Sequence, residues 1–162
     1  MIDVKTLPPE RWGEAKELRL QALKTDPTAF GSSYEEEENF TKEEWQMRMK
    51  NALFAMSDDS PVGTITYLFD GRLKTKHIAR IFAVYVDPKR RGQGIGNKLL
   101  ETALRLIQEN KGIVKVQLMV NLEQVAAVEL YKAMGFAVVG QMKKEIQVDG
   151  QFYDELIMEK ML

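Results

Sequence analysis

The feature that most constrains this chain is a strand, a glycine-rich turn and a helix in immediate succession. Residues 78–86 are nearly all apolar, with Arg80 the exception, and this pattern is typical of a central strand that is covered on both faces. Asp87 and Pro88 end that strand, and the basic, glycine-rich segment 89–96 leads into a helical stripe of apolar residues. The chain must therefore turn sharply from a buried strand into a helix.

Such a turn is suited to binding an anion. A helix N-terminus exposes backbone N–H groups and carries about half a positive charge, and glycines let the backbone approach a phosphate closely. Arg90, Arg91 and Lys98 add positive charge nearby. The segment therefore predicts a diphosphate site, although the glycine spacing alone fits a tight turn with a solvated basic rim equally well.

The chain of 162 residues contains no repeat or linker, so we predict a single domain over residues 1–162. The predicted fold class is α/β, an α+β mixed sheet that is largely antiparallel and has helices on both faces. The acidic run 35–38 is interpreted as a solvated loop. Periodicity, caps and breaks predict strands at 2–7, 52–56, 61–69, 78–86, 114–120, 136–145 and 152–161, and helices at 9–24, 42–51, 95–107 and 122–133.

Composition removes several classes of function. The chain has no cysteine and one histidine, His77, which excludes disulfides and a cysteine nucleophile and argues against a zinc site. A net charge of −1 offers no basic surplus for nucleic acid. No apolar run is long enough to span a bilayer, and the first residues lack the pattern of a signal peptide. We therefore expect a cytoplasmic protein with no metal, and with no nucleic-acid or membrane partner.

The spacing of the glycines distinguishes between known phosphate-binding loops. A P-loop places Lys and then Ser or Thr after its last glycine, whereas Asn97 follows Gly96 here. A Rossmann fingerprint needs Gly-x-Gly-x-x-Gly in an early βαβ unit, whereas Gly92, Gly94 and Gly96 are evenly spaced beyond the midpoint of the chain. Segment 91–96, Arg-Gly-Gln-Gly-Ile-Gly, instead resembles Gln/Arg-x-x-Gly-x-Gly/Ala, the acyl-CoA-binding signature of the GNAT superfamily of N-acetyltransferases.

A second block of sequence supports this resemblance. Residues 127–136, AVELYKAMGF, are similar to the family pattern A-x-x-L-Y-x-x-x-G-F. The resemblance implies a GNAT-like fold, with the sheet splayed at the central strand, and transfer of an acetyl group from acetyl-CoA to a primary amine by direct attack. For the acceptor we favour a small molecule of the amino-acid or polyamine type over a protein α-amine. A CoA-binding module without turnover is the alternative from another class, and a homodimer is compatible with either.

The resemblance also assigns roles to particular residues. The backbone N–H groups of residues 92–96 would hold the CoA diphosphate, and backbone groups of Val84 and Val86 would pair with the pantetheine arm and polarise the thioester carbonyl. Gln124 stands where the family usually has an asparagine that contacts the cofactor amides, and Asn121 is a substitute for it. The expected cofactor-binding residues are Val84, Val86, Arg91, Gly92, Gln93, Gly94, Ile95, Gly96, Asn97, Asn121 and Gln124.

Tyr131 would protonate the departing CoA thiolate, because a phenol of pKa about 10 can donate to a thiolate whose conjugate acid has a pKa of about 8.5. Without the surrounding motif, an ordinary buried aromatic side chain is the favoured interpretation of Tyr131. No base is evident, because Arg80 stands where some relatives have a glutamate on the central strand. We favour proton loss through water, with Glu35–Glu38, Asp154 and Glu155 as distant alternatives.

Overall fold

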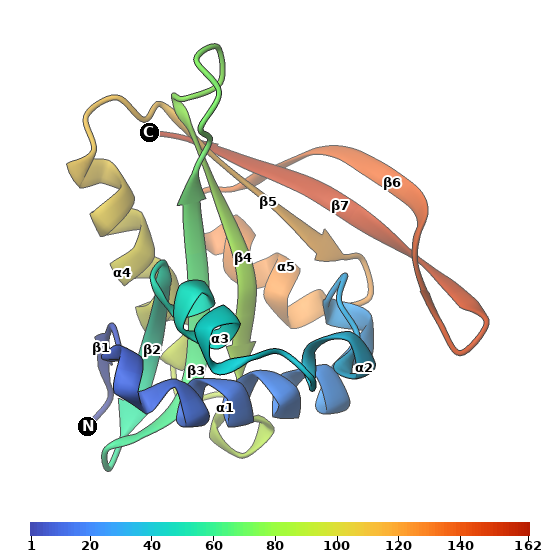
Figure 1. The fold of residues 1–162 in the computed structure, drawn as a ribbon. Coiled ribbons are helices and arrows are strands. Elements are labelled where there is room, and N and C mark those ends of the chain that lie inside the picture. The colour runs from blue at the N-terminus through green and yellow to red at the C-terminus, as the bar shows by residue number, and fades with distance from the viewer. The chain divides into compact units, whose positions relative to one another are not determined.

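The computed structural model describes residues 1–162 as five α-helices and seven β-strands (Figure 1). The helices are α1 (Trp12–Thr25), α2 (Tyr34–Glu37), α3 (Lys42–Met49), α4 (Ile95–Glu109) and α5 (Val125–Ala133). The strands are β1 (Asp3–Lys5), β2 (Ala52–Ser57), β3 (Ser60–Phe69), β4 (Ile78–Val86), β5 (Lys115–Asn121), β6 (Ala137–Val148) and β7 (Gln151–Met161). This order matches the predicted one, except that α2 lies where a loop was expected.

The sheet has the strand order β1-β2-β3-β4-β5-β7-β6. β4 and β5 are parallel, whereas the β1–β2, β2–β3, β5–β7 and β6–β7 pairs are antiparallel. The predicted α/β class with a largely antiparallel sheet is therefore confirmed. The chain forms two compact units, residues 1–66 with 83–104 and residues 67–82 with 105–162. Strands β3 and β4 and helix α4 contribute residues to both units, and the single domain remains a prediction.

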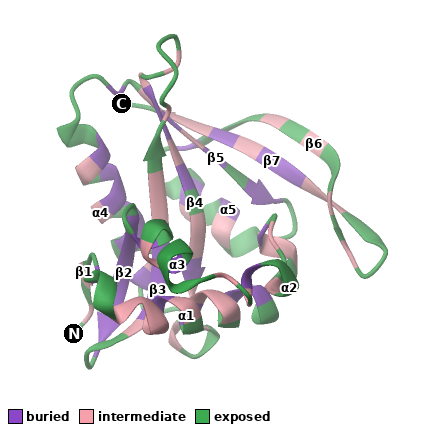
Figure 2. Ribbon diagram, viewed as in Figure 1, coloured by how far each residue is buried: buried purple, intermediate pink, exposed green.

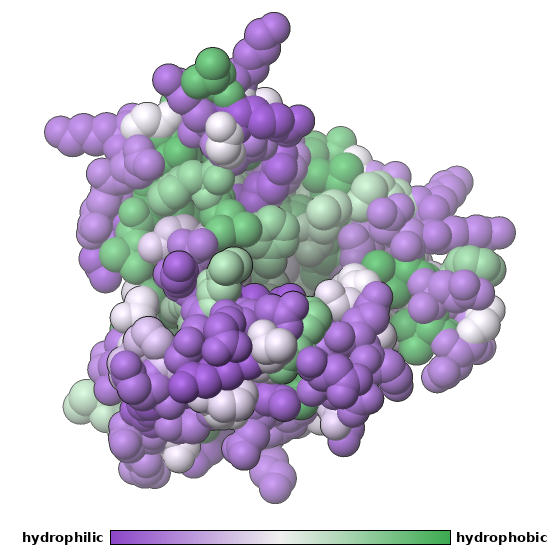
Figure 3. Space-filling model, in the orientation of Figure 1, coloured by the Kyte–Doolittle hydropathy of each residue, from purple (hydrophilic) through white to green (hydrophobic).

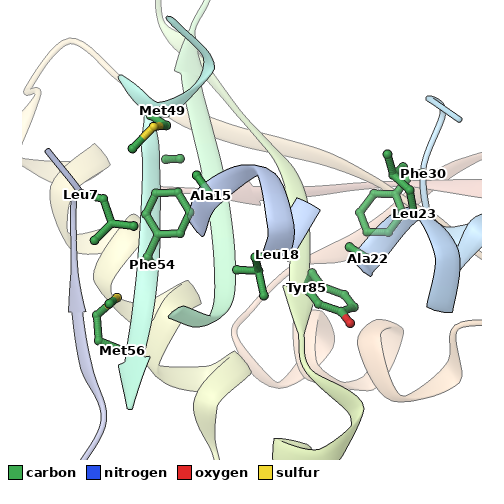
Figure 4. Close-up of a cluster of buried hydrophobic side chains, with 11 residues drawn as sticks. Leu7, Ala15, Leu18, Ala22, Leu23, Phe30, Met49, Phe54, Met56 and Tyr85 are labelled. Carbon is green, nitrogen blue, oxygen red and sulfur yellow. The ribbon is translucent and has the colours of Figure 1, made fainter. Parts of the chain in front are cut away.

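In the first unit, helices cover both faces of the sheet. Phe54 of β2 packs with Leu18 of α1 in a cluster of buried hydrophobic side chains (Figure 4), and β2 is buried along its whole length (Figure 2). Because side chains alternate along a strand, Ala55 points to the other face, where it pairs with Gly63 of β3. A Cβ at Gly63 would lie 3.1 Å from Leu99 Cδ1 of α4. Helix α4 therefore packs closely on the face opposite α1.

The acidic run 35–38 is not a solvated loop, and this part of the sequence prediction is wrong. Ser33 begins α2 with a capping box, in which its hydroxyl accepts a hydrogen bond from the Glu36 amide (3.3 Å). The Glu36 carboxylate in turn accepts one from the Ser33 amide (2.7 Å). This reciprocal pairing satisfies N–H groups that a helix start leaves without acceptors, so the acidic residues form one helical turn.

Glu37, the last residue of α2, is buried between two arginines. Its side chain is 1% exposed, and its carboxylate accepts two hydrogen bonds from Arg19 of α1 and one from Arg48 of α3, each at 2.9 Å. A carboxylate can be buried when charged donors surround it in this way. The partners lie 18 and 11 residues away in the chain, so no local pattern reveals the arrangement.

Glu37→Gln is expected to lower the free energy of unfolding by about 3 kcal/mol at pH 7, because it leaves two arginines around a neutral side chain. Burial acts to raise the pKa of Glu37, but the hydrogen bonds and charges of Arg19 and Arg48 outweigh it and lower the pKa. The stabilisation is therefore present above the ordinary glutamate pKa of about 4.3 and is lost as pH falls through the folded-state pKa. Urea unfolding of both proteins at several pH values measures this, and a difference that does not shrink in acid would contradict it.

In the second unit, β5 and β7 have one apolar face and one face with charged groups. Leu118 pairs with Met158, and both are buried. The alternate residues point the other way, and there Gln117 and Lys115 both donate to Glu159 Oε1 at 3.1 Å. Strand β4 pairs with β5 only as far as Arg80, although β4 itself continues to Val86. This early end of pairing is what a sheet that splays at β4 requires.

The β6–β7 hairpin turns between the two strands predicted at 136–145 and 152–161. Asp149 (φ 50°) and Gly150 (φ 76°) both have left-handed backbone conformations, as a tight two-residue hairpin turn needs. Strand β6 continues to Val148, beyond the predicted end at residue 145. Apolar side chains reach the surface of this hairpin, as the green atoms at the right of Figure 3 show, and Phe152 is half exposed.

Candidate functional site

The glycine-rich segment forms an open turn before α4. Gly92 (φ 75°) and Gly94 (φ 76°) adopt the left-handed backbone conformation, which glycine enters without steric cost. Both are exposed, and a Cβ at either position would meet no atom within 4 Å. A ligand can therefore approach the backbone of this turn closely.

The first turn of α4 supplies backbone donors. Its first residue, Ile95, is buried and anchors the helix. The Lys98 amide donates to the Gly94 carbonyl at 3.1 Å, so the amides of residues 95–97 precede the regular helical bonds and have no acceptor in the helix. The helix dipole and these amides suit a diphosphate. The Lys98 ammonium donates one hydrogen bond to the Ile2 carbonyl, which directs this side chain toward the N-terminal segment.

The side chain of Arg91 holds the turn in place. Its Nε donates to the Val86 carbonyl (3.0 Å) and its Nη2 to Asp26 Oδ2 (2.5 Å), and the guanidinium lies over the Tyr85 ring, 5.8 Å from the centroid. Asp26 is the residue that ends α1. Arg91 thus ties the turn to α1 and to the end of β4, and its backbone is the part that is left to contact a cofactor.

Strand β4 changes conformation immediately before Val84. Ala83 has a φ of 52°, which costs about 1–2 kcal/mol for a residue with a Cβ. Val84 and Val86 are half-buried, and between them the Tyr85 hydroxyl contacts Thr25 Oγ1 (3.0 Å) and accepts from Gln21 Nε2 (3.2 Å). The irregular backbone therefore lies where the cofactor contacts are expected. Sequence analysis missed it, because alanine carries no signal for this conformation.

Tyr131 is positioned by the end of α5. The Gly135 amide donates to the Lys132 carbonyl and the Phe136 amide to the Tyr131 carbonyl, both at 3.0 Å, and Gly135 has a φ of 90°. These are the bonds of a Schellman motif, which glycine allows. The Phe136 ring meets the Tyr131 ring at 63° with centroids 6.0 Å apart, an edge-to-face contact. The second sequence block therefore encodes a helix end that fixes Tyr131.

The phenol of Tyr131 is a proton donor at neutral pH. The residue is 5% exposed, and this burial raises the pKa of Tyr131 above its usual value near 10. The hydroxyl therefore keeps its proton throughout the range in which an enzyme works. The group is thus present in the protonated form that a general acid requires.

Asn121 and Gln124 form the turn between β5 and α5. The buried Asn121 side chain accepts from the Glu123 amide at 2.8 Å, and its carbonyl accepts from the Gln124 amide at 3.0 Å. Helix α5 therefore begins at Val125 instead of at the predicted Leu122. Gln124 is half-buried and its side chain does not cap the helix, so its amide group is not committed to the helix start.

Asp154, one of the carboxylates considered for proton transfer, and Arg80 both have structural partners. Asp154 accepts from Gln141 Nε2 and from the Lys144 amide, both at 2.8 Å, and so holds the irregular part of β6. Arg80 donates to Gln117 Oε1 at 3.3 Å. The structure contains no group of three His, Asp or Glu side chains arranged to hold a metal ion.

The expected site residues fall into two groups. In the first unit, the end of β4 and the glycine turn are joined by the Arg91–Val86 hydrogen bond, and this group contains Val84, Val86, Arg91, Gly92, Gln93, Gly94, Ile95, Gly96 and Asn97. In the second unit, the turn after β5 and helix α5 carry Asn121, Gln124 and Tyr131. The roles of all these residues in binding and catalysis stay predictions.

Known proteins similar to this chain share its fold and its family. The sequence profile of the acetyltransferase (GNAT) family matches residues 19–136. The L-amino acid N-acetyltransferase AaaT of Escherichia coli K12 is 25% identical over 121 residues, which are 72% of this chain and 74% of that protein. A GNAT-family acetyltransferase from Streptococcus pneumoniae superposes with a TM-score of 0.89 at 24% identity and full coverage of both chains.

A third comparison is with an acetyltransferase from Salmonella typhimurium whose structure was solved with its cofactor acetyl-CoA. It superposes with a TM-score of 0.83 at 18% identity, covering 100% of this chain and 94% of that one. This chain belongs to the GNAT family of acetyltransferases. It is an acetyl-CoA-dependent acyltransferase that carries out N-acetylation. None of its helices is both long and apolar enough to cross a membrane.

Proposed function

We propose that this enzyme acetylates the primary amine of a small molecule of the amino-acid or polyamine type by direct attack on acetyl-CoA. The observation that carries the choice of acceptor is the similarity to an L-amino acid N-acetyltransferase over 121 residues. The absence of cysteine supports direct attack, since the chain has no thiol that could carry the acetyl group.

The local geometry supports the roles that the family resemblance implies. The amides of the glycine turn and of the first turn of α4 bind the diphosphate of acetyl-CoA. The backbone N–H groups at Val84 and Val86 bind the pantetheine arm and polarise the thioester carbonyl. The Val86 carbonyl accepts a hydrogen bond from Arg91. Tyr131 gives its proton to the departing thiolate. Acetyl-CoA supplies an activated acetyl group, and the protein supplies the orientation and the proton.

Release of CoA tests this proposal. The enzyme is mixed with acetyl-CoA and, separately, with each of a panel of L-amino acids, polyamines and peptides with free N-termini, and the new thiol is measured over time. We expect at least one amino acid or polyamine to raise the rate well above hydrolysis without an amine. Acetylation of the peptides alone would overturn the small-molecule acceptor, and no release with any amine would overturn the proposed function.

A further inference from the structure

Glu155 of β7 is a buried carboxylate that none of the roles above uses. In the ladder it pairs with Asn121 of β5 and with Met142 of β6. The residue is 9% exposed. It therefore lies in the interior of the β5–β7–β6 sheet, on the face that Asn121 and Gln117 share.

The Glu155 carboxylate has no hydrogen-bond or ion-pair partner, unlike its neighbours on the same strand. Asp154 is bound by Gln141 and a backbone amide, and Glu159 is bound by Lys115 and Gln117. The two buried side-chain atoms that lack both a partner and contact with solvent are Trp45 Nε1 and Thr75 Oγ1. The Glu155 oxygens are not among these atoms and have no partner, so they keep some contact with solvent.

The charges around Glu155 do not stabilise its ionised form. Burial, and then the charge of Glu145 on β6, raise the pKa of Glu155. Asn121, opposite on β5, and Met142, opposite on β6, carry no charge. The Lys144 ammonium lies over the Phe152 ring, 5.5 Å from its centroid. A carboxylate taken out of water without a cation is costly, so a positively charged ligand that reaches Glu155 is stabilised there.

We propose that Glu155 binds the ammonium group of the acceptor and takes one proton from it before the amine attacks. The inference rests on the proposed function, because it assumes an amine acceptor. It replaces the expectation that water alone removes the proton. It also selects one of the six carboxylates that the sequence analysis considered as alternative proton acceptors. Of the others, Glu37 is bound by arginines and Asp154 holds β6.

The protons balance in this scheme. The ammonium R–NH3⁺ gives one proton to the Glu155 carboxylate, and the resulting R–NH2 forms a bond to the acetyl carbon while the carbon–sulfur bond breaks. The thiolate takes a proton from Tyr131, and the second proton lost by the nitrogen restores that phenol. Glu155 releases its proton to solvent, so one amide, one CoA thiol and one proton are formed.

The proposal predicts a particular pH dependence. Glu155 must be ionised to bind and deprotonate the ammonium, so kcat/KM for the amine falls as pH drops through the pKa of Glu155, which lies above that of an ordinary glutamate. Removal of the neighbouring charge by Glu145→Gln lowers that pKa, and the acid limb of the profile moves to lower pH.

The test compares Glu155→Gln with Glu159→Gln, a change of the same chemistry on the same strand and face. Glu155→Gln is expected to lower kcat/KM for the amine by about 100-fold or more, the scale of a lost general base, and to remove the acid limb. Acetyl-CoA affinity, measured by calorimetry, is expected to stay within about threefold. Glu159→Gln is expected to keep both the rate and the limb.

Three outcomes separate the possible failures. If wild-type enzyme acetylates an amine and Glu155→Gln keeps kcat/KM within about threefold, the role of Glu155 is overturned while the function stands. If the wild type acetylates no amine, the proposed function fails. An NMR titration of the Glu155 carboxyl with and without saturating ethylamine tests the site directly, since a bound ammonium must lower its pKa, and an unchanged pKa would overturn the proposal.

Discussion

Gly94→Glu is expected to abolish acetyl-CoA binding by a folded protein. Gly94 is exposed in the turn before α4, and a Cβ there meets no atom within 4 Å, so the new side chain has room. Its carboxylate lies beside the amides that the diphosphate needs. Like charges placed together cost several kcal/mol, so we expect affinity to fall by at least about 100-fold, which corresponds to about 2.7 kcal/mol.

Two controls separate charge from backbone strain. Gly94→Ala introduces the same backbone strain as Gly94→Glu, because a residue with a Cβ at a φ of 76° costs about 1–2 kcal/mol. It adds no charge, so we expect it to weaken binding far less than Gly94→Glu does. Gly71→Glu adds the same charge in the β3–β4 hairpin, where the new Cβ also meets no atom within 4 Å, and should bind normally. Calorimetry with acetyl-CoA, alongside circular dichroism, measures all three. Tight binding by a folded Gly94→Glu protein would show that the diphosphate lies elsewhere.

Much of the fold follows from local chemistry and was predictable from the sequence. The strand 78–86 was predicted at its observed bounds, because an apolar run closed by Asp87 and Pro88 has few alternatives. The turn at Asp149 and Gly150 was predictable for a similar reason, since this dipeptide favours left-handed backbone angles. Elements whose conformation is determined by a few neighbouring residues can therefore be predicted from the sequence.

Features that depend on distant partners were not predictable. The burial of Glu37 requires Arg19 and Arg48, which local periodicity does not connect to it. The start of α5 was placed too early, because Asn121 shapes the preceding turn with its side chain. The left-handed Ala83 is imposed by the surrounding sheet, since alanine itself disfavours that conformation.

The candidate site shows the same division. The glycine turn was predicted from its spacing, and Tyr131 from the resemblance to a family motif. Each belongs to a motif whose geometry is local: positive φ angles in the one and a Schellman helix end in the other. The clamp between Arg91 and Asp26 joins residues 65 positions apart, and the unpaired state of Glu155 depends on strands β5 and β6. Both needed the structure, since the sequence alone gives only their charges.

Tyr131→Phe is expected to reduce kcat by about 10²–10⁴-fold, the usual effect of removing a general acid. The substitution deletes only the hydroxyl, so the edge contact with Phe136 (6.0 Å between centroids) and the backbone bonds of the helix end remain. Acetyl-CoA affinity should therefore stay within about twofold. Because burial holds the pKa of Tyr131 above its usual value, wild-type kcat should show no fall from phenol ionisation as pH rises to about 10.

Leaving-group chemistry gives this prediction a second, independent measurement. The thiolate of a more acidic thiol can leave without receiving a proton. The loss of rate in Tyr131→Phe should therefore shrink when the acetyl donor is an acetyl-CoA analogue whose thiol has a lower pKa. A structural role for the ring would not produce that dependence, since Phe keeps the ring. If kcat of the variant stays within about threefold of wild type, a barrier change below 1 kcal/mol, then water or another residue protonates the thiolate and Tyr131 serves only to pack α5.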